Sequence, residues 1–368
     1  MSADGRLAEG HRIRIMAAVL AVLAVFASLA MLFFPSIGGV PDAVARHGAS
    51  CTTFMASDGY LVLLGDSEDE GMDHPLAGNP AASYAFFRTG NATEYGRMHL
   101  GWLWQGEHDS FQAGMNDHGL AYALTAVPDT PMAPHPERPF RHGRESFYDW
   151  ILRKAATVDE AIAEVLRFDF ASCWFQIQFA DALGNSAILS PGSDGEFVIT
   201  SRLPGDLMLV ASTFNRAEPD RYVGRDSFRR SEQAEAALGQ ALAEQLTVLS
   251  FTEALRAVDR QGPYAFNRSY TVYSTVYDLT NLEATLYVLS LYDLPIHLDL
   301  LEELSQGDHR VALRDLIPSN ALGAATRKYW ATQVGGFAAV GVPVAGFLVA
   351  LALGIRQLVR RRRERRAP

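Results

Sequence analysis

Cys51 is the residue of this 368-residue chain whose position suggests chemistry most directly. It follows an apolar segment and a short polar stretch, so cleavage of the Ser50-Cys51 bond would leave a thiol beside a free α-amine. An α-amine has an unperturbed pKa of about 7.7 to 8.0, so it can take the thiol proton and later deliver it to a leaving amine. The alternative is that Cys51 is a small buried hydrophobe, which is the commoner role of a lone cysteine.

The residues after Cys51 predict a β-hairpin that would carry the thiol. Asp58-Gly59 is typical of a turn, and 60–64 has the apolar character of a buried strand. Cys51 would therefore stand at the head of the first strand. A disulfide between Cys51 and Cys173 is an open alternative for an exported protein, and it would silence the thiol.

Two apolar runs, 15–34 and 334–355, are each long enough to cross a bilayer as a helix. Arginines precede the first run and follow the second, so the positive-inside rule puts both chain ends in the cytoplasm. The first run is alternatively a signal peptide cleaved after Ala45. We expect a membrane helix or signal segment (1–35), a propeptide or linker (36–50), one folded extracytoplasmic domain (51–318), a linker with Tyr329 and Trp330 at the membrane interface (319–333), a membrane anchor (334–355) and a basic cytoplasmic tail (356–368).

The charge distribution argues against a nucleic-acid partner. The formal net charge is −10, although the last 13 residues hold seven arginines and one glutamate. The rest of the chain is thus more acidic than the total, and an acidic external domain repels nucleic acid and anionic headgroups. We assign the arginine tail to membrane topology instead.

The spacing of potential ligands predicts neither a metal nor a cofactor. No grouping of His, Cys and carboxylates has zinc-like spacing, and no glycine loop of the P-loop or dinucleotide type is present in the sequence. His118 in a glycine-flanked turn is expected to be a solvated loop residue, and Cys173 beside Trp174 to be part of the core.

The order of predicted elements is strands, helix pair, strands, helix pair, strands. This order fits an α+β fold of two stacked sheets with helices outside. Thr157-x-x-Glu160 predicts a capping box at one helix start, and Ser250 is expected to cap another. The expected strands are 98–104, 121–127, 174–180, 186–190, 197–200, 207–212, 271–278 and 284–291, and the expected helices are 145–155, 157–167, 227–246, a short helix after Ser250, and 298–304.

Four stretches together resemble one family, the linear-amide C-N hydrolases of the N-terminal nucleophile superfamily. This group includes choloylglycine hydrolase, penicillin V acylase and 6-aminopenicillanate acyltransferase. The resemblance covers the chain from Cys51 to about Asp299. The matching stretches, in the family's order, are CTTF with DGYLVLLGDSED (51–69), AGMNDHGL (113–120), ASTFN (211–215) and YSTVYDL (273–279).

The resemblance implies a four-layer αββα sandwich whose first strand presents Cys51. It also implies autocatalytic cleavage before Cys51, attack of the thiolate on an amide carbonyl, and a thioester that water or another acceptor releases. Asp69 matches the family aspartate that hydrogen-bonds the α-amine. The enzyme would then be a hydrolase of carbon-nitrogen bonds in linear amides.

The chain departs from the family pattern at charged positions. Asp66 stands where the bile-salt and penicillin enzymes carry arginine, which makes anionic substrates less expected. A further family arginine matches either Arg221 or Arg229, and we favour Arg229.

The oxyanion hole is also altered relative to the family. Thr213 occupies the position of the family asparagine, with Asn215 two residues on, and either side chain could donate a hydrogen bond. The backbone N-H of Ala126 would be the second donor. Loss of one such donor typically costs about 10² to 10³ in rate.

The expected substrate is a small acyl amide with an apolar acyl or aryl side. Trp102 and Tyr122, with neighbouring aromatic residues, would line its pocket, although aromatics at strand spacing are commonly core. Two other functions stay open. One is acyl transfer to an amine, and the other is a catalytically silent binding domain in which Cys51 remains internal, as the Asp66 and Thr213 departures allow.

Overall fold

The structure is a computed structural model of the whole chain, and it divides into two units. One unit spans Asp42–Trp330, and the other joins Met1–Pro41 to Ala331–Pro368. The first apolar run and the predicted propeptide lie outside the part of the chain that the structure describes. The described residues are 51–71, 83–104, 108–141, 147–203, 205–212, 225–261 and 269–364.

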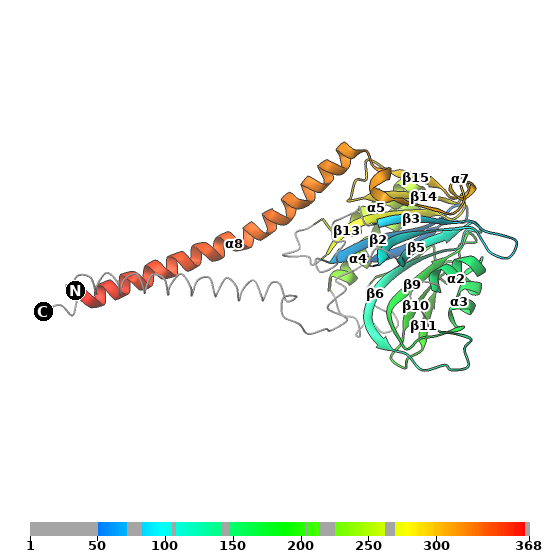
Figure 1. Cartoon of the computed structure of the whole chain (residues 1–368), viewed down its shortest axis with the longest axis horizontal. Coiled ribbons are helices and arrows are strands. Elements are labelled where there is room, and N and C mark those ends of the chain that lie inside the picture. Colours follow the sequence, from blue (N-terminus) through cyan, green and yellow to red (C-terminus); the bar gives the residue numbers. More distant parts are fainter. Residues whose placement is uncertain are drawn as a thin grey trace. The chain divides into compact units, whose positions relative to one another are not determined.

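One sheet of the folded unit contains the hairpin that follows Cys51 (Figure 1). Six described strands pair antiparallel in it, and the first two match the predicted hairpin. In sheet order they are β12 (Met208–Ala211), β1 (Thr52–Ser57), β2 (Val62–Gly71), β13 (Ser269–Asp278), β14 (Glu283–Val288) and β15 (Ile296–Asp299).

A second antiparallel sheet of eight described strands stacks on the first. Its strand β5 runs on to Asn116, and the turn predicted around His118 follows it. In sheet order the strands are β11 (Phe197–Ser201), β10 (Ser186–Pro191), β9 (Ser172–Ala180), β6 (Ala121–Pro131), β5 (His108–Asn116), β4 (Arg97–Trp104), β3 (Ser83–Arg88) and β16 (His309–Ala312). A short parallel pair, β7 (Phe140–Arg141) and β8 (Phe168–Asp169), lies apart.

Helices cover the outer face of each sheet, which gives the predicted αββα layering (Figure 1). The pair α2 (Phe147–Lys154) and α3 (Val158–Val165) packs on the eight-stranded sheet. The pair α4 (Arg225–Glu244) and α5 (Val248–Val258) packs on the six-stranded sheet. A third core fills the space between the two sheets.

Side-chain alternation along β1 and β2 assigns each residue to one of two layers. Met55 and Leu64 belong to the core between the sheets, whereas Phe54 and Leu63 pack beneath α4 and α5. Gly65 lies on the helix side, where an added Cβ would come within 2.7 Å of the Phe251 and Phe54 rings. A glycine is therefore needed where α5 crosses β2.

The observed N-cap residue agrees with the sequence prediction for one helix and differs from it for another. Thr157 accepts a hydrogen bond from the Glu160 N-H and caps α3, as predicted. The cap of α5 is Thr247, while Ser250 is the third helical residue that completes its capping box. The prediction of Ser250 as the cap was wrong by three residues.

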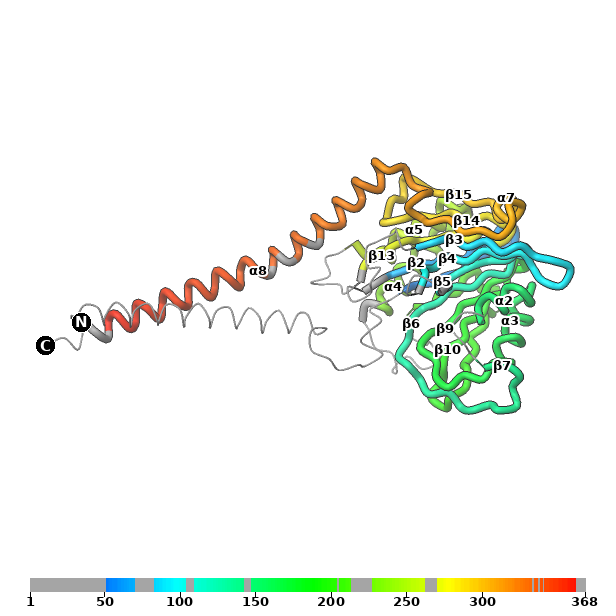
Figure 2. The backbone as a smooth tube through the Cα atoms, viewed as in Figure 1, coloured from blue at the N-terminus to red at the C-terminus, as the bar shows by residue number. Residues whose placement is uncertain are grey.

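The C-terminal segment is one helix, α8 (Ser319–Glu364), which passes into the second unit. The predicted linker 319–333 is therefore helical. Tyr329 is only 2% exposed and its ring lies 4.8 Å from that of Tyr270, so it anchors α8 to the folded unit rather than to a membrane interface. Trp330 is exposed. Among the described residues, α8 alone is long and apolar enough to cross a membrane (Figure 2).

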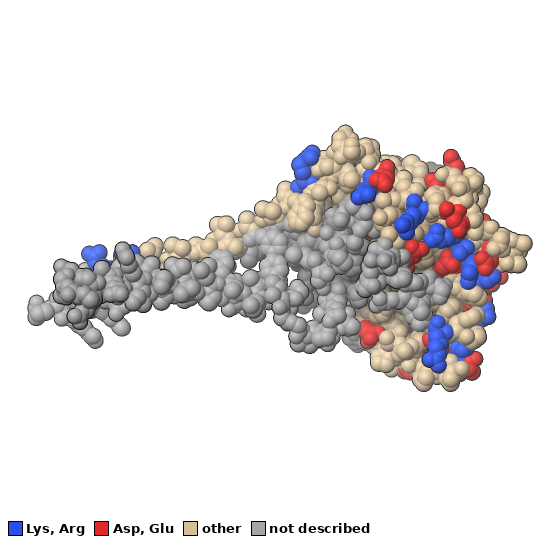
Figure 3. All heavy atoms as spheres, in the orientation of Figure 1, with Lys and Arg blue, Asp and Glu red and all other residues tan. Residues whose placement is uncertain are grey.

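A short helix, α7 (Leu300–Ser305), connects β15 to β16, and a 3-10 turn, η4 (Leu313–Leu316), leads from β16 to α8. On the visible face of the folded unit, acidic and basic side chains lie interspersed, whereas the visible part of α8 is largely uncharged (Figure 3). This contrast follows the sequence, since 331–355 has no charged residue.

Candidate active site

Cys51 lies immediately before β1 and is 3% exposed. Because Thr52 pairs with Ser67, the register places Cys51 opposite Glu68, on the face of the sheet that looks toward the other sheet. The Cys51 Sγ donates a hydrogen bond to Glu68 Oε2 at 3.5 Å. The thiol thus sits at the head of the hairpin, as predicted, with a buried carboxylate as its neighbour.

The surroundings of Cys51 disfavour the thiolate in the uncleaved chain. Burial raises the pKa of the thiol well above its ordinary value, and the carboxylates of Glu68, Asp69 and Asp66 raise it further. A hydrogen bond from the Asp69 backbone N-H acts in the opposite direction. A thiol in this state needs an additional positive charge or base before it can act as a nucleophile.

Asp69 is fully buried on the helix side of β2. Its Oδ1 accepts from Thr271 Oγ1 at 2.5 Å, and its Oδ2 accepts from Arg230 Nη1 at 2.6 Å. Arg260 Nε lies 3.5 Å from the same Oδ2. The carboxylate is charge-compensated and held by α4, β13 and the segment after α5, which fixes the end of β2 beside Cys51.

The arginine that reaches Asp69 is Arg230, the neighbour of the Arg229 that we favoured as the family arginine. The other candidate, Arg221, lies outside the described residues. Arg229 is exposed, whereas Arg230 is buried. The core positions of α4 include Ala234, Leu238 and Ala241, and Arg230 lies four residues before Ala234 on the same helix face. This helical periodicity was the signal that would have selected Arg230.

Residues near the predicted oxyanion hole are described only in part. Thr213 and Asn215 lie outside the described residues. The preceding Ser212 carbonyl accepts hydrogen bonds from Thr125 Oγ1 at 3.3 Å and from Gln176 Nε2. The chain that leads into Thr213 is therefore fastened to the second sheet.

Ala126 is half-buried in β6. It is paired with Phe175 at the last position before the β6 register shifts. The break in regular pairing begins at the residue whose N-H we predicted as an oxyanion donor.

The two predicted pocket aromatics separate onto opposite faces of the eight-stranded sheet. Trp102 is buried and shares the inner face of β4 with Met98 and Leu100. Tyr122 instead packs under α2, where its ring stacks on Tyr148 with centroids 5.3 Å apart. The placement of Tyr122 in the substrate pocket was wrong, because strand alternation turns it outward from β6.

The Tyr122 hydroxyl belongs to a buried network that fastens α2 to the sheet. His99 Nδ1 lies 3.1 Å from the Tyr122 hydroxyl, and His99 Nε2 lies 3.3 Å from Asp149 Oδ1. Arg97 binds Asp149 in bidentate fashion at 2.6 and 2.9 Å. Burial lowers the pKa of His99, so its imidazole is neutral near pH 7.

Asp66 lies on the inner face of the first sheet, between Thr53 of β1 and Thr275 of β13. It is fully buried, and neither carboxylate oxygen has a hydrogen-bond partner within the described ranges. Burial raises its pKa well above the ordinary value, and the Glu68 and Asp69 carboxylates add to the effect. The family arginine position is thus occupied here by an uncompensated acid.

Both cysteines are free thiols, so the alternative Cys51 to Cys173 disulfide is absent. Cys173 is buried in β9 and its Sγ contacts the Phe175 carbonyl oxygen at 3.1 Å. Burial raises the pKa of Cys173 to about 12. It is a core residue, as expected.

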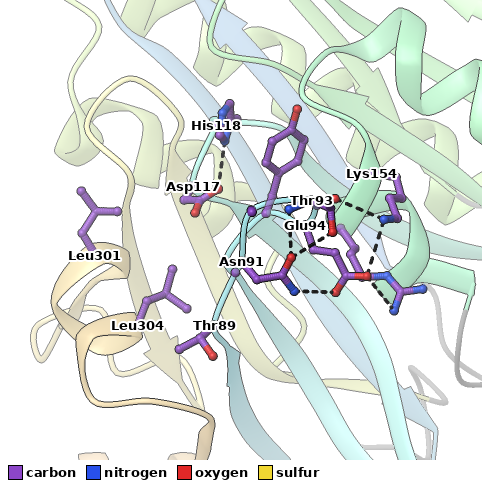
Figure 4. A pocket seen from close by; sticks show the side chains of 13 residues that line it. Thr89, Asn91, Thr93, Glu94, Asp117, His118, Lys154, Leu301 and Leu304 are labelled. Carbon is purple, nitrogen blue, oxygen red and sulfur yellow. Dashed lines mark hydrogen bonds and ion pairs between the residues drawn. The ribbon is translucent and has the colours of Figure 1, made fainter.

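The residues that line a surface cavity of about 730 Å³ do not include Cys51 (Figure 4). They include His118, which is half-exposed and contacts Asp117 Oδ1 at 2.9 Å. The adjacent Gly119 packs against Leu279, whose N-H bonds the Val62 carbonyl at the start of β2. Cys51 lies beside the other end of β2, so this cavity is at the opposite end of the sandwich.

No group of three or more His, Cys, Asp or Glu side chains in the described part of the chain is arranged to hold a metal ion. The described groups around the Cys51 thiol are the carboxylates of Glu68, Asp69 and Asp66 and the Asp69 backbone N-H. The sequence prediction missed Glu68, which contacts the thiol, and Arg230, which pairs with Asp69.

Two stacked antiparallel sheets with helices outside and a cysteine at the head of an inner strand define the N-terminal nucleophile hydrolase type of fold. The chain is similar to a variant of conjugated bile acid hydrolase from Clostridium perfringens, with a TM-score of 0.52 and 14% identity over 71% of this chain and 96% of that one. It is also similar to penicillin V acylase from Agrobacterium tumefaciens, with a TM-score of 0.50 and 19% identity over 68% of this chain and 87% of that one.

These comparisons confirm the predicted resemblance at the level of the fold. The neighbours are amide-bond hydrolases, and the similarity spans nearly their whole length. No protein-family model and no curated protein sequence matches this chain.

Proposed function

We propose that this chain is a membrane-anchored cysteine hydrolase of linear amides whose nucleophile, Cys51, is exposed by cleavage of the Ser50-Cys51 bond. The observation that supports this function best is the place of Cys51. Its thiol is buried at the head of β1, beside Glu68 and the Asp69 backbone N-H, in the fold of known amide hydrolases.

In the proposed reaction the Cys51 α-amine takes the thiol proton as Sγ attacks the amide carbonyl. The tetrahedral intermediate collapses when the C-N bond breaks, and the α-ammonium returns the proton to the leaving amine. The acyl group remains as a thioester. A water molecule, deprotonated by the same α-amine, then attacks the thioester and releases a carboxylic acid and the free thiol.

Cleavage before Cys51 would also favour the thiolate form of Cys51. In the intact chain, burial and three carboxylates raise its pKa. A new α-amine introduces a base and, when protonated, a positive charge within a few atoms of Sγ, which favours the thiolate. The acidic surroundings thus make the thiol a poor nucleophile toward substrate amides until the chain is cut.

The oxyanion of the tetrahedral intermediate needs donors at the end of β6 and at the exit of β12. We assign these roles to the Ala126 N-H and to Thr213 or Asn215. The hydrogen bonds from Thr125 and Gln176 to the Ser212 carbonyl support this assignment, because they fix the chain one residue before Thr213.

The experiment that tests the function identifies the N-terminal residue of the mature protein purified from membranes, by intact-mass measurement and terminal sequencing. The wild type is expected to begin at Cys51, and Cys51→Ala is expected to keep upstream residues. Cys173→Ala is the matched control, because it removes the other thiol from the core. If the wild type keeps Ser50, or Cys51→Ala is cut like the wild type, self-processing by Cys51 is wrong.

Activity is then measured on chromogenic amides. The wild type and Cys173→Ala are expected to release the amine from at least one of them, and Cys51→Ala none. Hydrolysis that survives Cys51→Ala would contradict the assignment of the nucleophile.

A further inference from the structure

Asp66 belongs to a set of buried polar groups on the inner face of the six-stranded sheet. Strand register sets the arrangement, since Glu68 is opposite Tyr273, Asp66 is opposite Thr275, and Leu64 is opposite Tyr277. Directly opposite residues in an antiparallel pair share a face. We call Asp66, Tyr273, Thr275 and Tyr277 the acidic inner patch.

The members of the acidic inner patch lack hydrogen-bond partners outside the patch. All four side chains are at most 1% exposed. Both oxygens of Asp66 and the Tyr273 hydroxyl have no hydrogen-bond partner among the residues that the structure describes, and Tyr277 and Thr275 interact only with each other there. Buried polar atoms are almost always paired in native proteins, so the unpaired Asp66 oxygens and Tyr273 hydroxyl on one face indicate a ligand that supplies the partners.

The chemistry of these atoms selects the ligand group. A carboxylate accepts hydrogen bonds, and hydroxyls can accept them as well. Two arginines of the described residues that reach β2, Arg230 and Arg260, pair with Asp69 on its helix side. A primary ammonium group has three N-H donors and the charge that would compensate Asp66.

Strand geometry also gives the distance from the nucleophile. Cys51 stands opposite Glu68, and Asp66 is two residues further along the same face of β2. Diagonal neighbours of this kind have Cα atoms about 7–8 Å apart. An acyl chain of about four to six carbons spans such a gap between a carbonyl at Sγ and a terminal group at Asp66.

We propose that the acidic inner patch binds a protonated primary amine at the end of the substrate's acyl chain, so that the enzyme prefers ω-aminoacyl amides. This specificity rests on the proposed amide hydrolase function. Asp66 is a specificity-determining residue in this view, and the tyrosine hydroxyls and Thr275 are further acceptors.

Binding of product analogues tests the patch without requiring catalysis. The mature wild-type protein in detergent is titrated calorimetrically with 5-aminopentanoate, pentanoate and glutarate, which differ mainly in the terminal group. We expect 5-aminopentanoate to bind at least about 10-fold more tightly than pentanoate, since a charged hydrogen-bonded pair is gained. Equal affinity for the two, or binding of neither, overturns the proposal.

Single substitutions test whether the preference for 5-aminopentanoate depends on the acidic inner patch. Asp66→Asn, which keeps the shape of the side chain, is expected to lose the preference for 5-aminopentanoate. Tyr277→Phe is expected to lose part of it, and it serves as an independent variant. Asp293→Asn removes the same charge from a side chain that is 99% exposed and is expected to bind like the wild type. A preference retained in Asp66→Asn contradicts the proposal.

Hydrolysis of the p-nitroanilides of the same three acyl groups distinguishes a failure of this specificity from a failure of the proposed amide hydrolase function. Preferred hydrolysis of the 5-aminopentanoyl compound, lost in Asp66→Asn, supports both. Equal hydrolysis of all three in the wild type overturns the specificity while the amidase stands. No hydrolysis together with selective binding of 5-aminopentanoate would reject the amidase but keep the ammonium site.

Discussion

At the scale of single residues, Asp69 and Asp66 show how the same side chain acts differently on the two faces of one strand. Asp69 on the helix side is paired with Arg230 and Thr271. Asp66 on the inner face is buried without a partner in the described part of the chain. One carboxylate is therefore a fixed structural anion, and the other is a destabilising group that a ligand can compensate.

Replacement of Asp66 by Asn is expected to stabilise the protein near neutral pH. The folded-state pKa of Asp66 is raised above its unfolded value of about 3.9, so the folded state holds the proton more tightly. The stability of the wild type should thus fall as pH rises above about 4 toward the raised pKa. The gain in Asp66→Asn is about 1–3 kcal/mol at pH 7 and smaller at pH 4.

Urea unfolding of the full chain in detergent at pH 4, 5.5 and 7 measures this dependence. Asp58→Asn is the control, since Asp58 is exposed in the β1 to β2 turn and its pKa is lowered, chiefly by the Leu61 and Tyr60 backbone N-H groups. That variant should lose stability above pH 4. An Asp66→Asn protein no more stable than the wild type at pH 7 would contradict the prediction.

The Arg230 contact makes a second prediction at the residue scale. Arg230→Met leaves the buried Asp69 charge with less compensation, and we expect a loss of about 3 kcal/mol in the free energy of unfolding. Arg229→Met changes an exposed neighbour and should stay within about 0.5 kcal/mol of the wild type. The denaturant midpoints of the two variants measure this difference in stability. Equal midpoints would contradict a stabilising ion pair between Arg230 and Asp69.

At the scale of elements, each helix pair is attached to its sheet by apolar contacts and by one buried ionic group. Arg230 joins α4 to β2 through Asp69, and Asp149 joins α2 to β4 through Arg97 and His99. The α4 contact reaches the candidate active site, whereas the α2 contact lies on the outer face of the other sheet. The second network is thus structural, although it contains a histidine and an aspartate.

Asp149→Asn should loosen α2. Burial raises the pKa of Asp149, but hydrogen bonds from His99 and Arg97 outweigh burial and hold that pKa well below the ordinary value. The ionised carboxylate therefore stabilises the fold above about pH 4, and this contribution is lost as pH falls through the lowered pKa. We expect Asp149→Asn to lose about 3–5 kcal/mol at pH 7, because Arg97 keeps a buried charge.

Unfolding at pH 7 and pH 3 measures the effect, and the difference from the wild type should shrink at the lower pH. Asp159→Asn on the neighbouring α3 is a suitable control, since that side chain is exposed. A wild-type midpoint for Asp149→Asn at pH 7 would show that the ion pair does not fasten α2.

At the scale of the whole molecule, the chain combines a folded unit with a long apolar helix. The core between the two sheets lies within the unit that ends at Trp330, and Tyr329 is the last residue of α8 that the described part of this core includes. Beyond this point the described side chains of α8 are largely exposed and uncharged up to Arg356. A surface of this kind is typical of a helix that spans a membrane.

We expect α8 to hold the mature protein in the membrane. Lysine at Val349, Leu351 and Leu353 should release the processed chain into the alkaline-carbonate supernatant, because each charge costs about 2.5–3.5 kcal/mol near the centre of a membrane helix. Lysine at the exposed Ile199, Leu203 and Leu207 of the folded unit is the matched control and should leave the protein in the pellet. Wild-type sedimentation of the first variant would show that α8 is not the anchor.

The sequence by itself determined the features that depend on neighbouring residues. Alternation in 51–69 predicted the hairpin, the Thr157 box predicted the start of α3, and the apolar run 334–355 predicted a continuous helix. These signals are local, because strand alternation, capping and helix length are properties of consecutive residues. The four family-like stretches extended them to the layered fold.

Tertiary structure alone decided which side chains share a site. The choice of Arg230 over Arg229, the contact of Glu68 with Cys51 and the outward face of Tyr122 all depend on pairing between segments far apart in the chain. Asp66 and Thr275 come together because β2 pairs with β13 across about 200 residues of sequence. Such register is set by the packing of whole sheets and helices, so no single stretch of sequence specifies it.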